Sequence, residues 1–169
     1  MNYATIKPCD VANGPGVRVS LFVSGCTHRC KGCFNPEAWD FAYGTPFGAA
    51  QTAEILQLLA PDYIRGFSLL GGEPFEAANQ PAVLVLLQEI RHTYPQKSIW
   101  AYSGYTFEQL CAGALPLLKL CDVLVDGPFI QEQKNLRLRF RGSENQRILD
   151  IPLSLAAGVP VNWNEEEMQ

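Results

Sequence analysis

Three cysteines stand close together in this chain, at a spacing that suits metal chemistry. Cys26, Cys30 and Cys33 form a Cys-x3-Cys-x2-Cys run inside the segment Ser24–Asn35. Soft thiolates on one short loop can hold three corners of an iron–sulfur cluster, and the fourth corner then lacks a local protein ligand. An iron left open in this way can bind a substrate or cofactor directly. The spacing therefore predicts a cluster that takes part in chemistry as well as in electron transfer.

The length and charge of the chain limit what surrounds these cysteines. With 169 residues, of which 47% are hydrophobic, the chain is long enough for one well-buried domain. We expect this domain to span residues 1–155, and residues 156–169 to form a C-terminal tail that is partly disordered and ends in a run of acids. The net charge of −4 argues against a nucleic-acid partner, because phosphate binding relies on clustered Lys and Arg.

The sequence also bears on the compartment. Its first residues lack the apolar core of a secretory signal, and no stretch approaches the apolar length of a membrane span. We therefore expect a cytoplasmic protein with no membrane partner. In that compartment the six cysteines are expected to be ligands, catalytic groups or small buried side chains rather than disulfides.

Strand and helix patterns alternate along the chain and must position the cysteines. Short β-branched or apolar runs that end at glycine turns predict strands, and apolar residues at helical spacing predict helices. The predicted strands are residues 17–23, 66–70, 98–102 and 122–125, and the predicted helices are 49–59, 81–94 and 107–120, the last interrupted near Gly113 and Pro116. From Phe129 onward the pattern is less regular.

Such alternation predicts an α/β fold with a mainly parallel sheet and right-handed crossovers. A closed eight-fold barrel usually needs about 250 residues, so this chain can form only part of a barrel or an open sheet. Four loops follow the carboxyl ends of predicted strands: the cysteine loop, 71–74, 103–106 and 126–129. Ligands bind at that end of parallel sheets, so we expect these loops to form one site.

At this point the motifs carry a family resemblance. The cysteine run followed by Gly71-Gly72-Glu73-Pro74 at the next strand end resembles the radical S-adenosylmethionine superfamily. More narrowly, five segments in order resemble the glycyl radical enzyme activases that serve anaerobic ribonucleotide reductase. These segments are Asn13–Arg18, Ser24–Asn35, Ser103–Thr106, Val123–Gly127 and Arg141–Arg147. The resemblance runs from about residue 2 to residue 150.

The resemblance implies a partial, open βα barrel of radical S-adenosylmethionine type. It implies that Cys26, Cys30 and Cys33 ligate a 4Fe-4S cluster whose fourth iron is chelated by the amino and carboxylate groups of S-adenosylmethionine. One electron from the cluster then cleaves the sulfonium and releases a 5′-deoxyadenosyl radical, and no catalytic side chain beyond cluster and cofactor is predicted. The implied partners are the large subunit of anaerobic ribonucleoside-triphosphate reductase, whose glycine receives the radical, and a reduced flavodoxin-type electron donor.

The resemblance also implies residues that hold the cofactor. Gly71 and Gly72 suit close approach of backbone to its methionyl end, because they lack a Cβ and can adopt positive φ. Glu73 is expected to accept a charge-assisted hydrogen bond from its ammonium group. Many superfamily members carry an aromatic residue just before the third cysteine, whereas this chain has Gly32 there and Phe34 after it. We therefore assign the adenine to the backbone from Gly32 through Cys33 to Phe34.

Other polar residues near the site have structural alternatives. Ser103 is a candidate for contact with the ribose or carboxylate of the cofactor, but it is equally an ordinary residue at a helix start. Asp126 is a candidate hydrogen-bond partner of the cofactor, or simply part of an Asp-Gly-Pro turn. The loop from Arg141 to Arg147 could bind cofactor or partner, or be a solvated loop. His28 lies between two thiolates and is expected to be exposed.

Two rival interpretations remain open at the level of sequence. A structural zinc module could use the three cysteines with a distant Cys9 or with His28, although structural zinc sites usually come as two paired knuckles and no second Cys-x2-Cys exists here. Within the superfamily, the chain could instead activate another glycyl radical enzyme or act on a small metabolite. The short chain favours a protein substrate, because an incomplete barrel leaves a flank open.

Overall fold

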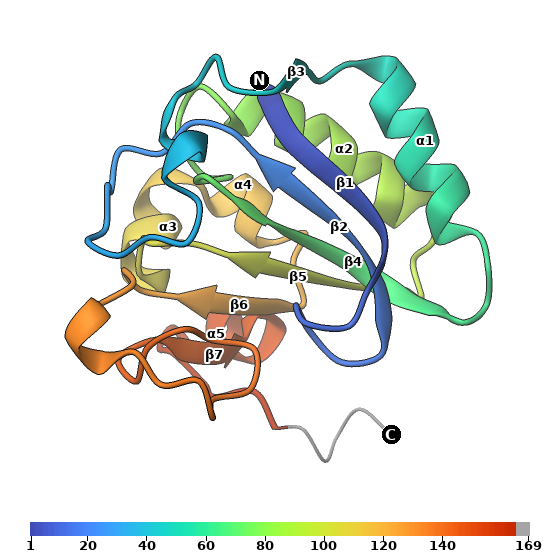
Figure 1. The fold of residues 1–169 in the computed structure, drawn as a ribbon. Coiled ribbons are helices and arrows are strands. Elements are labelled where there is room, and N and C mark those ends of the chain that lie inside the picture. Colours follow the sequence, from blue (N-terminus) through green and yellow to red (C-terminus); the bar gives the residue numbers. More distant parts are fainter. Residues whose placement is uncertain (165–169) are drawn as a thin grey trace.

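One mixed β-sheet organises the molecule. A computed structural model describes residues 1–164, and within them seven strands pair in the order β3-β1-β2-β4-β5-β6-β7 (Figure 1). β2, β4, β5 and β6 are parallel neighbours, whereas β1, β3 and β7 pair antiparallel with theirs. The strands are β1 (Asn2–Asp10), β2 (Val17–Val23), β3 (Thr45–Pro46), β4 (Ile64–Gly71), β5 (Ser98–Tyr102), β6 (Val123–Asp126) and β7 (Arg147–Asp150). The predicted α/β class and mainly parallel centre are confirmed, and the sheet does not close into a barrel.

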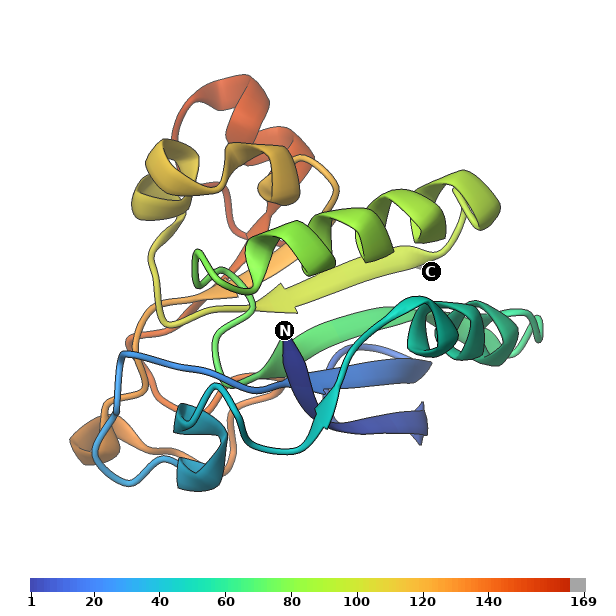
Figure 2. The ribbon, with the colours of Figure 1, turned by 90° about the horizontal axis from the view of Figure 1, so that it is seen from above.

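Helices connect the parallel strands and cover one face of the sheet. Figure 2 shows α2, α3 and α4 on the same side of the strands. The helices are α1 (Ala49–Leu59), α2 (Gln80–Thr93), α3 (Phe107–Gly113), α4 (Leu115–Leu118) and α5 (Ile151–Ala157), with short 3-10 turns η1 (Pro36–Trp39) and η2 (Gln131–Gln133). The break between α3 and α4 falls where Gly113 and Pro116 predicted it, because proline is tolerated only in the first turn of a helix.

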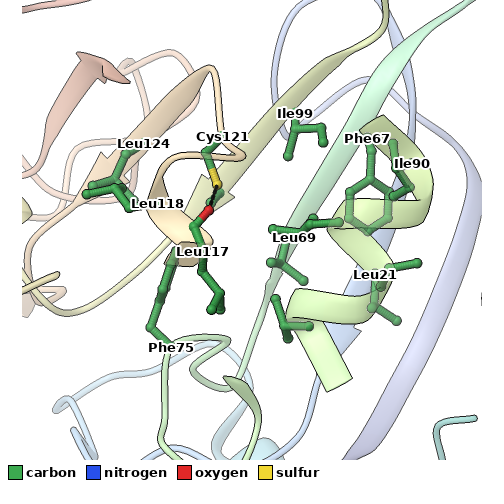
Figure 3. Packing of buried hydrophobic residues seen from close by; sticks show 14 of the residues in the cluster. Leu21, Phe67, Leu69, Phe75, Ile90, Ile99, Leu117, Leu118, Cys121 and Leu124 are labelled. Carbon is green, nitrogen blue, oxygen red and sulfur yellow. Dashed lines mark hydrogen bonds between the residues drawn. The ribbon is translucent and has the colours of Figure 1, made fainter. Parts of the chain in front are cut away.

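The main core lies between the sheet and these helices. Alternate residues of the central strands, such as Leu21 and Leu69, point toward the helices and are fully buried. The inner face of α2 meets them through Ile90 and neighbours at helical spacing. Figure 3 shows this packing, in which Leu117 and Leu118 of α4 belong to the same cluster. Each such side chain stabilises the fold by about 1.5 to 3 kcal/mol through its removal from water.

The opposite face of the sheet contains a buried cation. Arg18 is fully buried, and its guanidinium lies 5.6 Å from the ring centre of Trp100. It donates to Ser68 Oγ at 2.7 Å and to the carbonyl oxygen of Phe67 at 2.8 Å. Burial lowers the pKa of Arg18 to about 10, so the group stays charged at neutral pH. Arg18 also donates to Ser98 Oγ at 3.0 Å and to Ser98 O at 2.9 Å, so its hydrogen bonds join β2, β4 and β5 on the face away from the helices.

The longest elements that were not predicted are β1, β7 and α5. β1 carries Pro8 and register shifts in its pairing, and most of it is exposed, so it lacks the alternation of a half-buried strand. β7 and α5 lie in the region expected to be irregular. After α5 the chain returns along β7, because Asp150 N donates to Val161 O and Trp163 N to Ile148 O. Residues 165–169, the end of the predicted acidic tail, lie outside the described residues.

Candidate functional site

A cavity of about 520 Å³ lies at the carboxyl ends of the parallel strands. The four loops that follow β2, β4, β5 and β6 all contribute to it, so the prediction that they meet at one edge is confirmed. Its lining includes Cys26, His28, Cys30, Gly32, Cys33, Phe34, Leu70, Gly71, Gly72, Glu73, Tyr102, Ser103, Gly104, Gly127, Phe129, Lys134, Leu136, Leu138, Phe140, Arg141 and Gln146. The volume is typical of a pocket that encloses a cofactor-sized molecule.

All three cysteines of the motif open into this cavity as free thiols. Their loop is fixed at its start by two backbone hydrogen bonds to the η1 segment, from Gly25 N to Ala38 O at 2.8 Å and from Cys26 N to Trp39 O at 3.2 Å. Cys33 N closes a turn onto Cys30 O at 3.1 Å. These main-chain hydrogen bonds fix the start of the loop and the turn at its end.

Glu73 is the most heavily bonded side chain of the site. It is fully buried, and Oε1 accepts from Phe75 N at 3.0 Å and Ser103 Oγ at 2.9 Å. Oε2 accepts from Gly104 N at 2.8 Å and lies 3.0 Å from His28 Nε2. The contact with a cofactor ammonium expected from the sequence stays a prediction. The structure shows that both oxygens already join the loops after β2, β4 and β5.

His28 is not exposed, so that prediction is wrong. Its side chain is only 18% accessible, because the ring contacts Glu73 and stacks edge-on against Tyr105 at 4.4 Å between ring centres. A Cβ on Gly104 would stand 2.5 Å from the His28 ring, so the glycine makes room for it. The hydrogen bond to Glu73 raises the pKa of His28. A histidine inside the cysteine run thus ties that run to the loop after β5.

A second carboxylate holds the same loop. Glu76 Oε1 accepts from Thr27 N at 2.8 Å and from Thr27 Oγ1 at 2.5 Å. Glu73 and Glu76 therefore bind the consecutive residues His28 and Thr27, which lie between the first two cysteines. Sequence reasoning missed Glu76 and Thr27. The signal available was a second acid three residues after Glu73, at the spacing that places both on one side of a turn.

Gly71 and Gly72 are required by the packing of the loops themselves. Gly71 has φ +114°, and a Cβ there would stand 2.5 Å from the backbone nitrogen of Val23. A Cβ on Gly72 would stand 2.6 Å from Gly25 O. The hydrogen bonds Gly72 N to Val23 O and Glu73 N to Gly25 O run through the same contact. The two glycines let the end of β4 lie directly against the cysteine loop.

The remaining predicted site residues divide into two groups. Ser103 lies at the cavity and donates to Glu73, and Gly32 and Phe34 also line it. Asp126 is buried but does not line the cavity. Its Oδ1 accepts from Arg147 Nε at 2.9 Å, and its Oδ2 accepts from Phe107 N at 2.7 Å, so it connects β7 to the start of α3.

Comparison with known proteins agrees with this arrangement. Residues 12–149 match the model of a family described as a 4Fe-4S single cluster domain. A Vibrio cholerae protein is 47% identical over 150 residues, which are 88% of this chain and 97% of the relative, and an Escherichia coli K12 protein is 44% identical over 86% and 96%. A phage T4 protein is 41% identical over 88% and 93%. All three are named anaerobic ribonucleoside-triphosphate reductase-activating protein. This chain belongs to that family.

The donor set of this family member fits an iron–sulfur cluster better than a single metal ion. Three thiols from one loop share a cavity, and thiolate sulfur is the ligand such clusters prefer. Within residues 1–164, no group of three or more His, Cys, Asp or Glu side chains is close enough to hold one ion. In a cluster each thiolate binds a different iron, so the sulfurs can be farther apart. Burial raises the pKa of Cys26 to about 11, so iron binding must displace its proton.

The last wall of the cavity along the chain was the part of the site that sequence reasoning located least well. It is a strap of residues 129–146 that packs over the cavity through apolar residues such as Phe129 and Phe140. Gln146 closes the strap: Oε1 accepts from Gly142 N at 2.8 Å, and Nε2 donates to Gly127 O at 3.1 Å. The polar segment from Arg141 to Arg147 therefore includes residues with a structural role.

No helix within residues 1–164 combines the length and apolar character needed to cross a bilayer.

Proposed function

We propose that this chain activates anaerobic ribonucleoside-triphosphate reductase by generating a glycyl radical on its large subunit. The observation that carries the proposal is the single cavity into which Cys26, Cys30 and Cys33 open beside the Gly71–Glu73 turn. The relatives of the chain add support, because proteins that match it over almost their whole length bear the name of the reductase-activating protein.

The residues of the cavity divide the work. When bound, a 4Fe-4S cluster and S-adenosylmethionine supply a one-electron cleavage that yields a 5′-deoxyadenosyl radical, which removes a hydrogen atom from a glycine Cα. The three cysteines would hold three irons and leave the fourth to the cofactor. Gly32 to Phe34 would lie along its adenine, and Gly71 to Glu73 along its methionyl end, with Ser103 beside them. Asp126 would not contact the cofactor, but its hydrogen bonds to Arg147 and to the start of α3 would hold the adjoining strand and helix in place.

The open sheet gives this function its access route. We assign the fold of residues 1–155 to the partial βα barrel of radical S-adenosylmethionine type. β2, β4, β5 and β6 supply parallel barrel-like strands, and the sheet stops at β3 on one edge and β7 on the other. A glycine-bearing loop of the reductase would enter along the unclosed side. We place the reaction in the cytoplasm, with electrons from a reduced flavodoxin-type protein.

The alternatives are less well supported. Activation of another glycyl radical enzyme or attack on a small metabolite would retain the cavity, but the names of the relatives favour the reductase. A zinc module would need ligands gathered around one ion. His28, one of the suggested fourth ligands, is instead bound to Glu73, and Cys9, the other, is an exposed free thiol.

The decisive experiment combines the chain with the reductase. After anaerobic reconstitution with iron and sulfide, we expect about four irons per chain. Addition of S-adenosylmethionine, a reductant and the reductase should give a glycyl radical signal by electron paramagnetic resonance. Cys30→Ala should abolish both 5′-deoxyadenosine production and the radical. A reconstituted wild-type protein that produces 5′-deoxyadenosine but no radical on the reductase would refute the assigned partner, and one that binds tight zinc but no cluster would refute the chemistry.

A further inference from the structure

Positive charge is concentrated beside the cysteines although the chain as a whole is acidic. Segments 29–31 and 131–141 contain six cations and a single acid, Glu132, and thus a formal charge of +5. The other seven cations and 16 acids leave −9 for the rest of the chain, which gives the net −4 of the whole. We call the six cations the cationic collar: Arg29, Lys31, Lys134, Arg137, Arg139 and Arg141.

The two segments of the collar lie side by side in the fold. Lys31 Nζ is 2.9 Å from Glu132 Oε1, and a Cβ on Gly32 would stand 2.7 Å from the Gln131 side chain. Figures 1 and 2 both show the blue cysteine loop next to the orange turn η2. Lys134 and Arg141 line the cavity together with the three cysteines. Two members of the collar therefore lie at the mouth of the site, and the other four belong to the two segments that contribute to its lining.

The collar is directed into solvent. Five of its six members are exposed, the exception being the half-buried Arg141. The Lys31–Glu132 pair is exposed on both sides, and its two charges cancel at a distance, which the formal charge of +5 already includes. At physiological ionic strength the field of this net charge extends about 8 Å from the surface. A net charge of one sign beside a cleft attracts partners of opposite sign and raises their association rate by roughly 10- to 1,000-fold.

Two large apolar side chains stand within the collar. Phe34 is 79% exposed and Leu136 is 89% exposed, and both line the mouth of the cavity. Exposed aromatic and aliphatic side chains inside a charged rim are the usual composition of a protein–protein contact. A small anion would need neither side chain, so the combination favours a protein partner with acidic groups around an apolar centre.

We propose that the cationic collar is the docking surface for an acidic one-electron donor protein. The inference rests on the proposed function, which requires the donor to lose one electron and the cluster to gain it. Arg29 and Lys31 flank Cys30 in sequence, so a protein held by the collar lies against the cysteine loop itself. Contacts between redox partners are small and brief, and they depend on charge steering rather than on deep interlocking surfaces. Flexible exposed Lys and Arg side chains suit that kind of contact.

A charge-reversal experiment with two electron sources tests this surface. Arg137→Glu with Arg139→Glu reverses two collar charges without altering a cysteine or a residue assigned to the cofactor. The matched control, Arg65→Glu with Lys119→Glu, makes the same change in net charge at the other end of the strands, where Arg65 is the second residue of β4 and Lys119 precedes β6. The initial rate of 5′-deoxyadenosine formation is measured with limiting reduced flavodoxin, an acidic protein, and with dithionite.

We expect the flavodoxin-driven rate of the collar variant to fall about tenfold or more. Added salt should also lower the flavodoxin-driven rate of the wild-type protein. The dithionite-driven rate of the collar variant, and both rates of the control variant, should equal those of the wild type. An unaltered flavodoxin-driven rate would overturn the proposal. A parallel fall with dithionite would also overturn it, because the residues would then act on the site itself.

The remaining outcomes are equally decisive. Weakened capture of the reductase, with an unchanged flavodoxin-driven rate, would assign the collar to the reductase and reject the donor. A wild-type protein that works with dithionite but not with flavodoxin would reject an acidic donor at this surface. Failure of the wild-type protein with dithionite would refute the proposed function, which distinguishes that failure from failure of the docking surface.

Discussion

Exchange of Glu73 for glutamine changes one atom of the most heavily bonded group in the site. The amide has one acceptor oxygen where the carboxylate has two, and its nitrogen is a donor. If the nitrogen takes the place of Oε2 it faces Gly104 N–H, and if it takes the place of Oε1 it faces Phe75 N–H. Neither backbone donor can rotate away. One buried N–H is therefore left unpaired in either orientation.

The expected loss follows from the energy of such contacts. A hydrogen bond to a charged acceptor contributes about 1.5 to 3 kcal/mol, and the bonds that survive in Glu73→Gln lose their charge assistance. We expect the free energy of unfolding to fall by about 2 to 4 kcal/mol, a large share of the 5 to 15 kcal/mol typical of a domain.

Glu76→Gln is the matched control. Among the described residues both hydrogen bonds to Glu76 fall on Oε1, so an amide oxygen at that position keeps Thr27 N and Oγ1. We expect it to cost less than about 1 kcal/mol.

The measurement is chemical denaturation of the metal-free wild-type and variant proteins, followed by circular dichroism and interpreted with a common slope. The contrast between the two variants matters more than either value, because the substitution is the same and the residues are three apart in one loop. Equal losses for Glu73→Gln and Glu76→Gln, or a larger loss for Glu76→Gln, would refute the account in which all four contacts of Glu73 hold the loops together.

Three further predictions concern the packing and charge around the site. Leu69→Ala, in the fully buried centre of β4, should lower the free energy of unfolding by about 2 to 5 kcal/mol in denaturant titrations; a loss below 1 kcal/mol would contradict its core position. Gly72→Ala should reduce the iron bound after reconstitution while helix content by circular dichroism is retained, because its Cβ displaces backbone of Gly25; full iron content would show that the loop tolerates the shift. The hydrogen bond from Arg147 lowers the pKa of Glu108 from 4.5 to about 2, so its contribution to stability is present above pH 4.5 and is lost as the pH falls toward 2. The difference in unfolding free energy between wild type and Glu108→Gln should shrink over that range. A difference that grows as the pH falls would show that the ionised Glu108 does not stabilise the fold.

The central strands could be predicted because their sequence reflects their burial. β6 begins with a continuous apolar run, and β4 is mostly apolar and buried from Gly66 to Leu70. Both end at glycine turns, as strands covered on both faces do. β1 and β7 lack that signal. β1 contains Pro8 and is largely exposed, and β7 begins with Arg147 and ends with Asp150, so their partners in the sheet decide their conformation.

The site shows the same division between local and distant causes. The cysteine spacing and the two glycines predicted where the cavity lies, because each motif is contained in one short segment. The role of Glu73 could not be predicted in this way. Its partners come from the loop after β2 and from Ser103 and Gly104, 30 and 31 residues farther along the chain, and only the folded sheet brings them together. The exposure expected for His28 was wrong for the same reason.

The order in which the cavity walls occur along the chain has a consequence for how the protein is made. The hydrogen bonds that hold the cysteine loop, to Glu73 and Glu76 with Gly104 N donating to Glu73, involve only residues within the first 104 of the chain. The strap of residues 129–146 and the pairing of β7 come later. An iron–sulfur assembly factor that met the nascent chain would find the cysteines already held and the strap side still uncovered. A full-length chain offers the same thiols only through the finished mouth.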